Sequence, residues 1–140
     1  MAASDGAMEI DMVMDIEAFR QKDYEKVSAG IINIVEAAEG RIVKVIIESC
    51  LWTDEEIKIA CEVVQGSSAQ FVKSSTGFST HGATIDHIKI MRESVGDLFG
   101  VKASGGIKSF DDALMMIQAG ANRLGTSSGA EIMKTEKLKS

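Results

Sequence analysis

The sequence predicts an α/β fold in which about five strand–helix units form part of a (β/α)8 TIM barrel. Three observations lead to this prediction: short β-branched runs alternate with amphipathic helical patterns, polar residues recur on one face of several expected strands, and the chain has only 140 residues. A closed barrel of eight units typically needs about 250 residues. We therefore expect one incomplete barrel domain over residues 1–140, with a polar helix end or tail at residues 131–140.

Five apolar runs have the length and the β-branched composition of buried strands. They cover Ile10–Met14, Ile42–Ile47, Ala69–Ser74, Gly100–Ala103 and Asn122–Gly125. A helical pattern follows each of the first four runs. Strands that alternate with helices through short connections predict a parallel sheet with helices outside it, either an open doubly wound sheet or a barrel.

The expected helices each carry an apolar face and a recognisable end. Thr53 and Glu56 have the spacing of a capping box at the start of one helix. The apolar positions recur at helical intervals, in the sets Val27, Ile31, Ile34 and Val35; Ile57, Ala60, Cys61 and Val64; Ile85, Ile88, Met91 and Val95; and Ala113, Leu114 and Ile117. Glycines stand where helix C-caps are expected, at Gly40, Gly66, Gly96 and Gly120.

The two faces of the expected strands differ in polarity, which separates a barrel from an open sheet. Three alternating sets share a face: Asp11, Val13 and Asp15; Phe71, Lys73 and Ser75; and Gly100, Lys102 and Ser104. An open sheet with helices on both sides needs apolar residues on both faces. A barrel interior accepts polar residues as part of a site. The polar face therefore favours a barrel.

Composition limits the classes of function. The net charge of −6 argues against nucleic acid or an anionic membrane as a partner, because either would favour a basic surface. We find neither an apolar run of about 18 residues nor a signal peptide, and therefore expect a cytoplasmic protein. Cys50 and Cys61 are too few for a metal site or a disulfide framework, and we expect reduced, packed thiols and no metal or other cofactor.

Two lysines occupy equivalent places in neighbouring units. Lys73 in FVKSSTG and Lys102 in GVKASGG stand 29 positions apart, about one strand–helix–strand unit. That spacing places two amines in one pocket, where a second ammonium makes a neutral amine at Lys73 more favourable and suits it to Schiff-base chemistry. Asp11, inward on a more distant strand, would hold Lys102 charged and relay a proton. The alternative is that each lysine merely extends from a strand end into solvent.

Glycine-rich turns follow the last two expected strands. Gly105 and Gly106 lead into a helix capped by Ser109, and Gly125 is followed by Thr126, Ser127, Ser128 and Gly129. Backbone N–H groups in such turns bind phosphate, and barrels of this class place phosphate sites in these two loops. The alternative is that both clusters only form tight turns.

Three segments resemble one known family. The runs VKVIIESCLWTDEE, FVKSSTGFSTHGAT and GVKASGGIKSFDDALMMIQAGANRLGTSSG are similar to the C-terminal part of deoxyribose-phosphate aldolase, and EIDMVMDI is similar to its middle strand. The resemblance implies family strands 4–8 of a class I aldolase that cleaves 2-deoxyribose 5-phosphate without a metal or organic cofactor. It implies that Lys73 forms the Schiff base, that Lys102 perturbs it and relays protons, and that Asp11 is the acid–base carboxylate. It also implies a phosphate site formed by Gly77, Gly105, Gly106, Ser127 and Ser128.

The sequence departs from the family pattern at Asp15, Glu17 and His81, and the first three family strands have no counterpart in it. An arc of five strands has two unpaired edges, which favour association. We therefore expect a small phosphorylated sugar as substrate, together with a homo-oligomer or a complementing N-terminal segment as partner. A non-catalytic half-barrel that keeps the fold and the phosphate-binding loops is the alternative.

Overall fold

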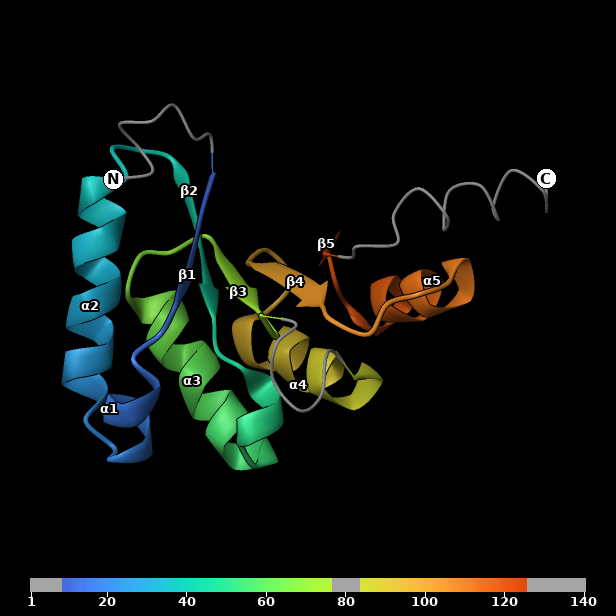
Figure 1. Ribbon diagram of the computed structural model, residues 1–140, viewed down its shortest axis with the longest axis horizontal. Helices are drawn as coiled ribbons and strands as arrows, with labels where there is room; N and C mark the ends of the chain where they lie inside the picture. Colours follow the sequence, from blue (N-terminus) through green and yellow to red (C-terminus); the bar gives the residue numbers. More distant parts are fainter. Residues whose placement is uncertain (1–8, 77–83, 126–140) are drawn as a thin grey trace.

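The structure is a computed structural model that describes residues 9–76 and 84–125 of the chain (Figure 1). Its strands are β1 (Glu9–Val13), β2 (Ile42–Ile46), β3 (Phe71–Lys73), β4 (Gly100–Ser104) and β5 (Arg123–Gly125). Its helices are α1 (Ile16–Arg20), α2 (Tyr24–Ala37), α3 (Asp54–Gly66), α4 (Ile85–Val95) and α5 (Phe110–Ala119), with a short 3-10 helix, η1 (Ser49–Leu51), after β2. Each expected strand is present, with bounds that differ by at most two residues.

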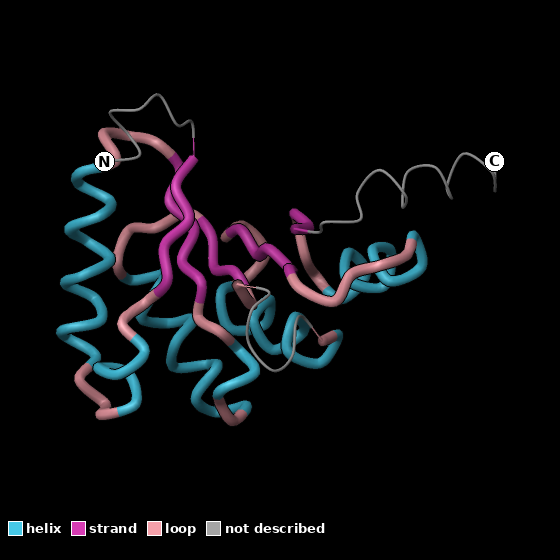
Figure 2. The backbone as a smooth tube through the Cα atoms, in the orientation of Figure 1, coloured by secondary structure: helices cyan, strands magenta, loops and turns pink. Residues whose placement is uncertain are grey.

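The described strands form one parallel sheet in the order β1-β2-β3-β4-β5, which is also their order along the chain. Parallel neighbours joined by right-handed crossovers place all connecting helices on the same side of a sheet. Figures 1 and 2 show α2, α3, α4 and α5 following one another along that side. This is an arc of a (β/α)8 barrel, as expected, and not a doubly wound sheet; among the described residues no helix covers its inner face.

The core lies between the outward face of the sheet and the helices. Val43, Val45, Val72 and Val101 point outward from β2, β3 and β4 and are fully buried. They meet the apolar faces of the helices, whose fully buried side chains are Val27, Ile31, Ile57, Val64, Ile88 and Met91. At the start of α3 the predicted capping box is present: Thr53 accepts from the Glu56 amide, and Glu56 accepts from the Thr53 amide.

The predicted helix faces need one correction, at α5. Leu114 and Ile117, expected inside, are 41% and 52% exposed, and the buried side chains of α5 are Ala113, Met116 and Ala119. The reason is that α5 is apolar on more than one side, so its sequence alone does not fix which side meets the sheet. Small residues at Ala113 and Ala119 allow this helix to approach β5 and α4 closely.

The predicted helix ends are confirmed at two of four glycines. Gly96 and Gly120 are the C-caps of α4 and α5, with φ of 82° and 125°. Gly66 instead lies inside α3, and a left-handed backbone occurs two residues later at Ser68 (φ 70°). Gly40 (φ 84°) lies two residues beyond the C-cap of α2, Ala38.

Several expectations concern residues outside the described ranges, namely the tail at 131–140, Gly77, His81, Ser127 and Ser128. Within the described ranges, none of the helices is long and apolar enough to span a bilayer. Cys61 is buried, Cys50 is half-buried, and both thiols are free, as predicted.

Candidate active site

The inner face of the sheet brings together the residues expected to be catalytic. Register pairs Asp11 with Lys44 between β1 and β2, and Lys73 with Lys102 between β3 and β4. Because side chains alternate along a strand, these four residues all point to the uncovered side of the arc. Asp15, expected on the same face, lies beyond the end of β1 and caps α1 by accepting a hydrogen bond from the Ala18 amide at 3.0 Å.

The three predicted catalytic side chains meet at one carboxylate oxygen. Nζ of Lys73 donates to Oδ2 of Asp11 at 2.9 Å, and Nζ of Lys102 lies 4.0 Å from the same oxygen. The lysines are mostly withdrawn from solvent, with side chains 14% and 17% exposed. Two amines and a carboxylate thus share one small space, an arrangement suited to proton transfer between them.

Burial and neighbouring charges act in opposite directions on the pKa of Asp11. Burial raises the pKa of Asp11, but the hydrogen bond and charge of Lys73, with the charges of Lys44 and Lys102, outweigh burial and hold that pKa below its usual value. The carboxylate is therefore ionised at neutral pH.

The pKa of Lys102 is lowered, first by burial and then by the charges of Lys73 and Lys44, against the opposing charges of Asp11 and Glu9. From the sequence we expected Asp11 to hold Lys102 charged. In the structure burial outweighs the attraction of Asp11, so the pKa of Lys102 lies below its usual value.

Hydrogen bonds fix the strand ends that carry the two lysines. Oγ of Ser74 donates to the Ser104 carbonyl at 3.2 Å and accepts from the Ser104 amide at 3.0 Å. Oγ of Ser104 donates to the Ser75 carbonyl at 2.6 Å. These bonds hold the carboxyl ends of β3 and β4 together. At Gly125 on β5, an added Cβ would stand 3.2 Å from Cε of Lys102, so glycine leaves room for that side chain.

Glu48, which follows β2, binds Thr76, which follows β3. This carboxylate is buried, with only 4% of the residue exposed, and it accepts from the amide and the hydroxyl of Thr76 at 2.9 and 2.8 Å. Glu48 has a left-handed backbone (φ 57°), which is uncommon for a residue other than glycine. Sequence reasoning missed this contact, and it also missed the serine pair above.

Three further charged residues extend the group along the inner face. Nζ of Lys44 lies 2.5 Å from Oε1 of Glu9 and 3.4 Å from Oδ1 of Asp11. Arg123 donates to both carboxylate oxygens of Glu9, and its Cζ atom lies 4.8 Å from the centre of the Phe71 ring. Sequence reasoning assigned no role to Lys44. A signal was present, because Glu9 and Asp11 alternate along β1 and therefore place two acids on the face to which Lys44 also belongs.

The glycine turn after β4 lies at the carboxyl-terminal end of the parallel strands. Gly105 and Gly106 have φ of 84° and 74°, a conformation that favours glycine, and Ser109 caps α5 as predicted. This places two of the five expected phosphate-site residues beyond the strand that carries Lys102. The other three, Gly77, Ser127 and Ser128, lie outside the described residues.

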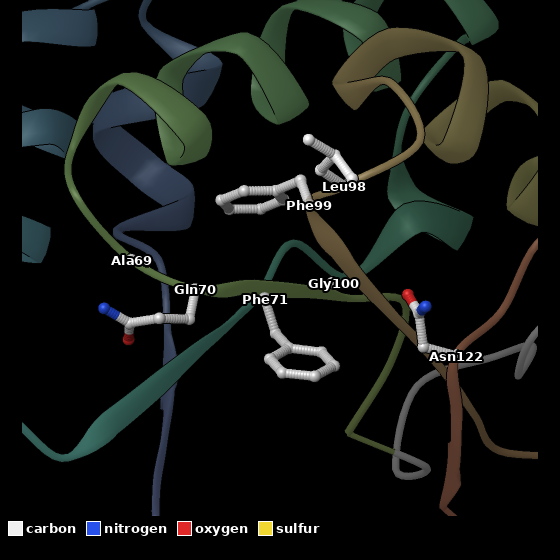
Figure 3. A pocket seen from close by; sticks show the side chains of 7 residues that line it. All are labelled: Ala69, Gln70, Phe71, Leu98, Phe99, Gly100 and Asn122. Carbon is white, nitrogen blue, oxygen red and sulfur yellow. The ribbon is translucent and has the colours of Figure 1, made fainter.

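A hollow of about 440 Å³ lies at the opposite, amino-terminal ends of β3 and β4 (Figure 3). Its lining is Ala69, Gln70, Phe71, Leu98, Phe99, Gly100 and Asn122, without any ionisable side chain. Chemistry of the kind expected here needs titratable groups, so we place the site at the lysines and not in this hollow. In the described part of the chain, no three His, Cys, Asp or Glu residues gather as metal ligands would.

Comparison with curated sequences supports the family resemblance, although no family model matches. The chain is 53% identical over 136 residues to deoxyribose-phosphate aldolase of Streptococcus sanguinis, covering 97% of this chain and 62% of that protein. It is 51% identical over 138 residues to the enzyme of the same name from Macrococcus caseolyticus, covering 99% and 63%. The chain thus spans less than two thirds of these relatives.

Solved structures agree with the sequence comparison. A putative deoxyribose-phosphate aldolase from Coccidioides immitis has a TM-score of 0.92 at 38% identity, covering 97% of this chain and 55% of that one. Tetrameric deoxyribose phosphate aldolase from Aeropyrum pernix has a TM-score of 0.89 at 33% identity, covering 99% and 58%. These coverages are consistent with the C-terminal portion of a barrel. Over nearly all of its length, therefore, the chain is a homologue of the deoxyribose-phosphate aldolases.

Proposed function

We propose that this chain carries the Schiff-base centre of a class I aldolase that reversibly cleaves 2-deoxy-D-ribose 5-phosphate to acetaldehyde and D-glyceraldehyde 3-phosphate, a step of deoxyribonucleotide catabolism. One observation carries the proposal: a single oxygen of Asp11 lies 2.9 Å from Nζ of Lys73 and 4.0 Å from Nζ of Lys102. The names of the relatives support the choice of substrate.

In the proposed reaction, the neutral amine of Lys73 attacks the aldehyde carbon of the open-chain sugar. A C–N bond forms, water leaves, and an iminium ion results. The C3 hydroxyl then loses its proton, the C2–C3 bond breaks, and its electron pair moves into the iminium system to give an enamine. Glyceraldehyde 3-phosphate departs. Protonation of the enamine and addition of water release acetaldehyde and restore Lys73.

Lys102 and Asp11 move the protons in these steps. In this proposal Asp11, which is ionised, accepts a proton, and Lys102, whose pKa burial lowers, passes protons between Asp11 and the substrate. The sugar phosphate would bind the backbone N–H groups of Gly77, Gly105 and Gly106 and the hydroxyls of Ser127 and Ser128. Neither a metal nor an organic cofactor takes part in these steps.

Reductive trapping tests the nucleophile. The protein is incubated with acetaldehyde and borohydride, and the modified peptide is mapped by mass spectrometry. We expect an ethyl group on Lys73. Modification elsewhere, with Lys73 intact, would refute the assignment.

Anion titration tests the phosphate site separately. Phosphate at millimolar concentration should shift the amide resonances of Gly105 and Gly106, because backbone N–H groups are the proposed donors. The amide of Gly30, an exposed position on α2, serves as an internal control. Equal shifts at all three positions would argue against a specific phosphate site.

A second candidate is a non-catalytic half-barrel that binds phosphate, and the observation in its favour is that the chain spans only 62% of its relative. A coupled aldehyde assay separates the two: adduct formation without turnover supports the half-barrel, and turnover supports the aldolase. Addition of a second chain or of a complementing N-terminal segment should raise turnover if the barrel must be closed.

A further inference from the structure

The two carboxylate oxygens of Asp11 have different partners. Oδ2 lies 2.9 Å from Nζ of Lys73 and 4.0 Å from Nζ of Lys102, whereas Oδ1 lies 3.4 Å from Nζ of Lys44. One oxygen therefore faces both lysines of the proposed centre, and the other faces a third lysine that the proposed reaction does not use.

Lys44 is the most deeply buried of the three lysines. Its side chain is 5% exposed, compared with 14% for Lys73 and 17% for Lys102. An ammonium group withdrawn from water needs anionic partners, because the loss of hydration is otherwise too costly. Lys44 has two such partners, Oε1 of Glu9 at 2.5 Å and Oδ1 of Asp11 at 3.4 Å. Its location is thus determined by the carboxylates on β1.

Neighbouring strands fix Lys44 in this place. Asp11 and Lys44 are register partners in the ladder of β1 and β2, so their side chains leave the sheet side by side. Glu9, the other carboxylate partner of Lys44, is itself held in place, because Arg123 on β5 donates to both of its oxygens. A carboxylate without such a contact turns easily about its last torsion angle.

We propose that Lys44 is a positioning residue, which holds Oδ1 of Asp11 so that Oδ2 faces Lys73 and Lys102. This inference rests on the proposed function, because it assigns a role within the same centre. The charge of Lys44 also helps to keep Asp11 ionised: burial raises the pKa of Asp11, and Lys73, Lys44 and Lys102 together lower it further than burial raises it.

The test compares two neutral variants, Lys44→Met and Lys44→Gln, with the charged variant Lys44→Arg. The first readout is the rate at which borohydride traps acetaldehyde on Lys73 at one mildly alkaline pH, and the second is the titration midpoint of the Asp11 carboxylate. We expect both neutral variants to trap roughly 10- to 100-fold more slowly, because small displacements of a reacting group have effects of this size. We also expect the Asp11 midpoint to move to higher pH, because Asp11 loses a cation that favours its ionised form.

Lys44→Arg should restore the Asp11 midpoint. The other charged groups that face Asp11, namely Glu9, Lys73, Lys102 and Arg123, are the same in all variants. A matched control is Lys58→Met, which removes one lysine from the exposed side of α3, where it pairs with Glu55 at 3.1 Å. That variant should trap at the unmodified rate and leave the Asp11 midpoint unchanged.

A second measurement separates this inference from the proposed function. The Cγ resonance of Asp11 is titrated by NMR in the unmodified chain and in the neutral variants. If the unmodified chain forms no adduct on Lys73, the proposed function fails, and the Asp11 titration alone decides the role of Lys44. A midpoint that rises in the neutral variants supports the inference. An unchanged Asp11 midpoint in the two neutral variants overturns it, as does an unchanged rate of trapping.

Discussion

Arg123 donates hydrogen bonds to both carboxylate oxygens of Glu9, although the two residues are 114 positions apart. Glu9 lies on the first strand of the described sheet and Arg123 on the last, so the contact crosses the inner face of the arc. The Phe71 ring lies beneath the guanidinium group, 4.8 Å from its Cζ atom. The pair connects the two edge strands directly and helps to set the curvature of the sheet.

Acid should weaken this connection. Hydrogen bonds from Arg123 and then Lys44 lower the pKa of Glu9 from 4.5 to about 2. A carboxylate with a depressed folded-state pKa contributes stability above its unfolded pKa, and that contribution is lost as the pH falls. We expect Glu9→Gln to lower the urea midpoint of unfolding at about pH 6, and the difference from the unmodified chain to disappear between pH 4.5 and about 2. In the control Glu55→Gln, which affects an exposed pair, the midpoint should hardly change.

Gly100 should not tolerate a side chain. A Cβ atom there would stand 2.4 Å from Cδ2 of Phe71, whose ring also supports Arg123. Gly100→Ala should therefore destabilise the fold by about 1–3 kcal/mol, as overpacking of a core does. Gly30→Ala is the matched control, because nothing lies within 4 Å of the added Cβ and the position is within α2. There the same change should stabilise by about 0.5–1 kcal/mol. Urea unfolding of both variants measures the two effects, and equal effects would contradict the packing argument.

The two lysines of the proposed centre should respond differently to substitution. Lys73→Leu should abolish borohydride trapping of acetaldehyde, because the nucleophile is gone. Lys102→Leu should slow trapping by about 100-fold without abolishing it, because the amine proposed to move protons during imine formation is gone. Continued trapping in Lys73→Leu would show that another amine forms the imine.

The sequence predicted the arc, and the meeting of three polar side chains on its inner face, because both depend on simple periodicities. Alternation along β1, β3 and β4 put Asp11, Lys73 and Lys102 on one face, and in the structure Nζ of each lysine lies within 4.0 Å of Oδ2 of Asp11. Strand–helix alternation likewise identified each strand in its order. These signals are local, and the barrel geometry converts them into a site.

Other features depend on contacts between distant segments, which no local pattern encodes. Glu48 and Thr76 are 28 positions apart, and nothing near either residue indicates their pairing. The burial of Lys44 depends on carboxylates on another strand, β1. Which side of α5 is exposed depends on how this helix packs against the sheet. A pattern that is apolar on more than one side, such as FDDALMMIQA, leaves that choice to tertiary packing.

The two cysteines should differ in reactivity. Burial, with a smaller contribution from the charge of Glu62, raises the pKa of Cys61 to about 12, and this residue is 0% exposed. Thiolate is the form that reacts with alkylating reagents. We therefore expect iodoacetamide at about pH 8 to modify half-buried Cys50 first and Cys61 only after unfolding in urea. Modification of both cysteines at equal rates in the native state would mean that the buried face of α3, which includes Cys61, becomes exposed to solvent readily.

The edges of the arc should drive association of the 140-residue chain. In the described sheet β1 and β5 each have a single neighbouring strand, and Val13 near one edge is 43% exposed. Unpaired backbone groups at such edges bind further strands. Sedimentation of the isolated chain should show dimers or larger species, and turnover should be far below that of a closed barrel. A stable monomer with full turnover would contradict this expectation.

The strand order also has a consequence for the path of folding. Every strand pairs with the next one in the chain, so the sheet can grow from one unit to the next through contacts of short sequence separation, which favour rapid folding. The charged group is different, because Asp11 meets Lys73 from 62 positions away and Glu9 meets Arg123 from 114. These contacts form only when β1 and the later strands are in place. The arc should therefore assemble early, and Lys73 and Lys102 should acquire their carboxylate partner among the last steps.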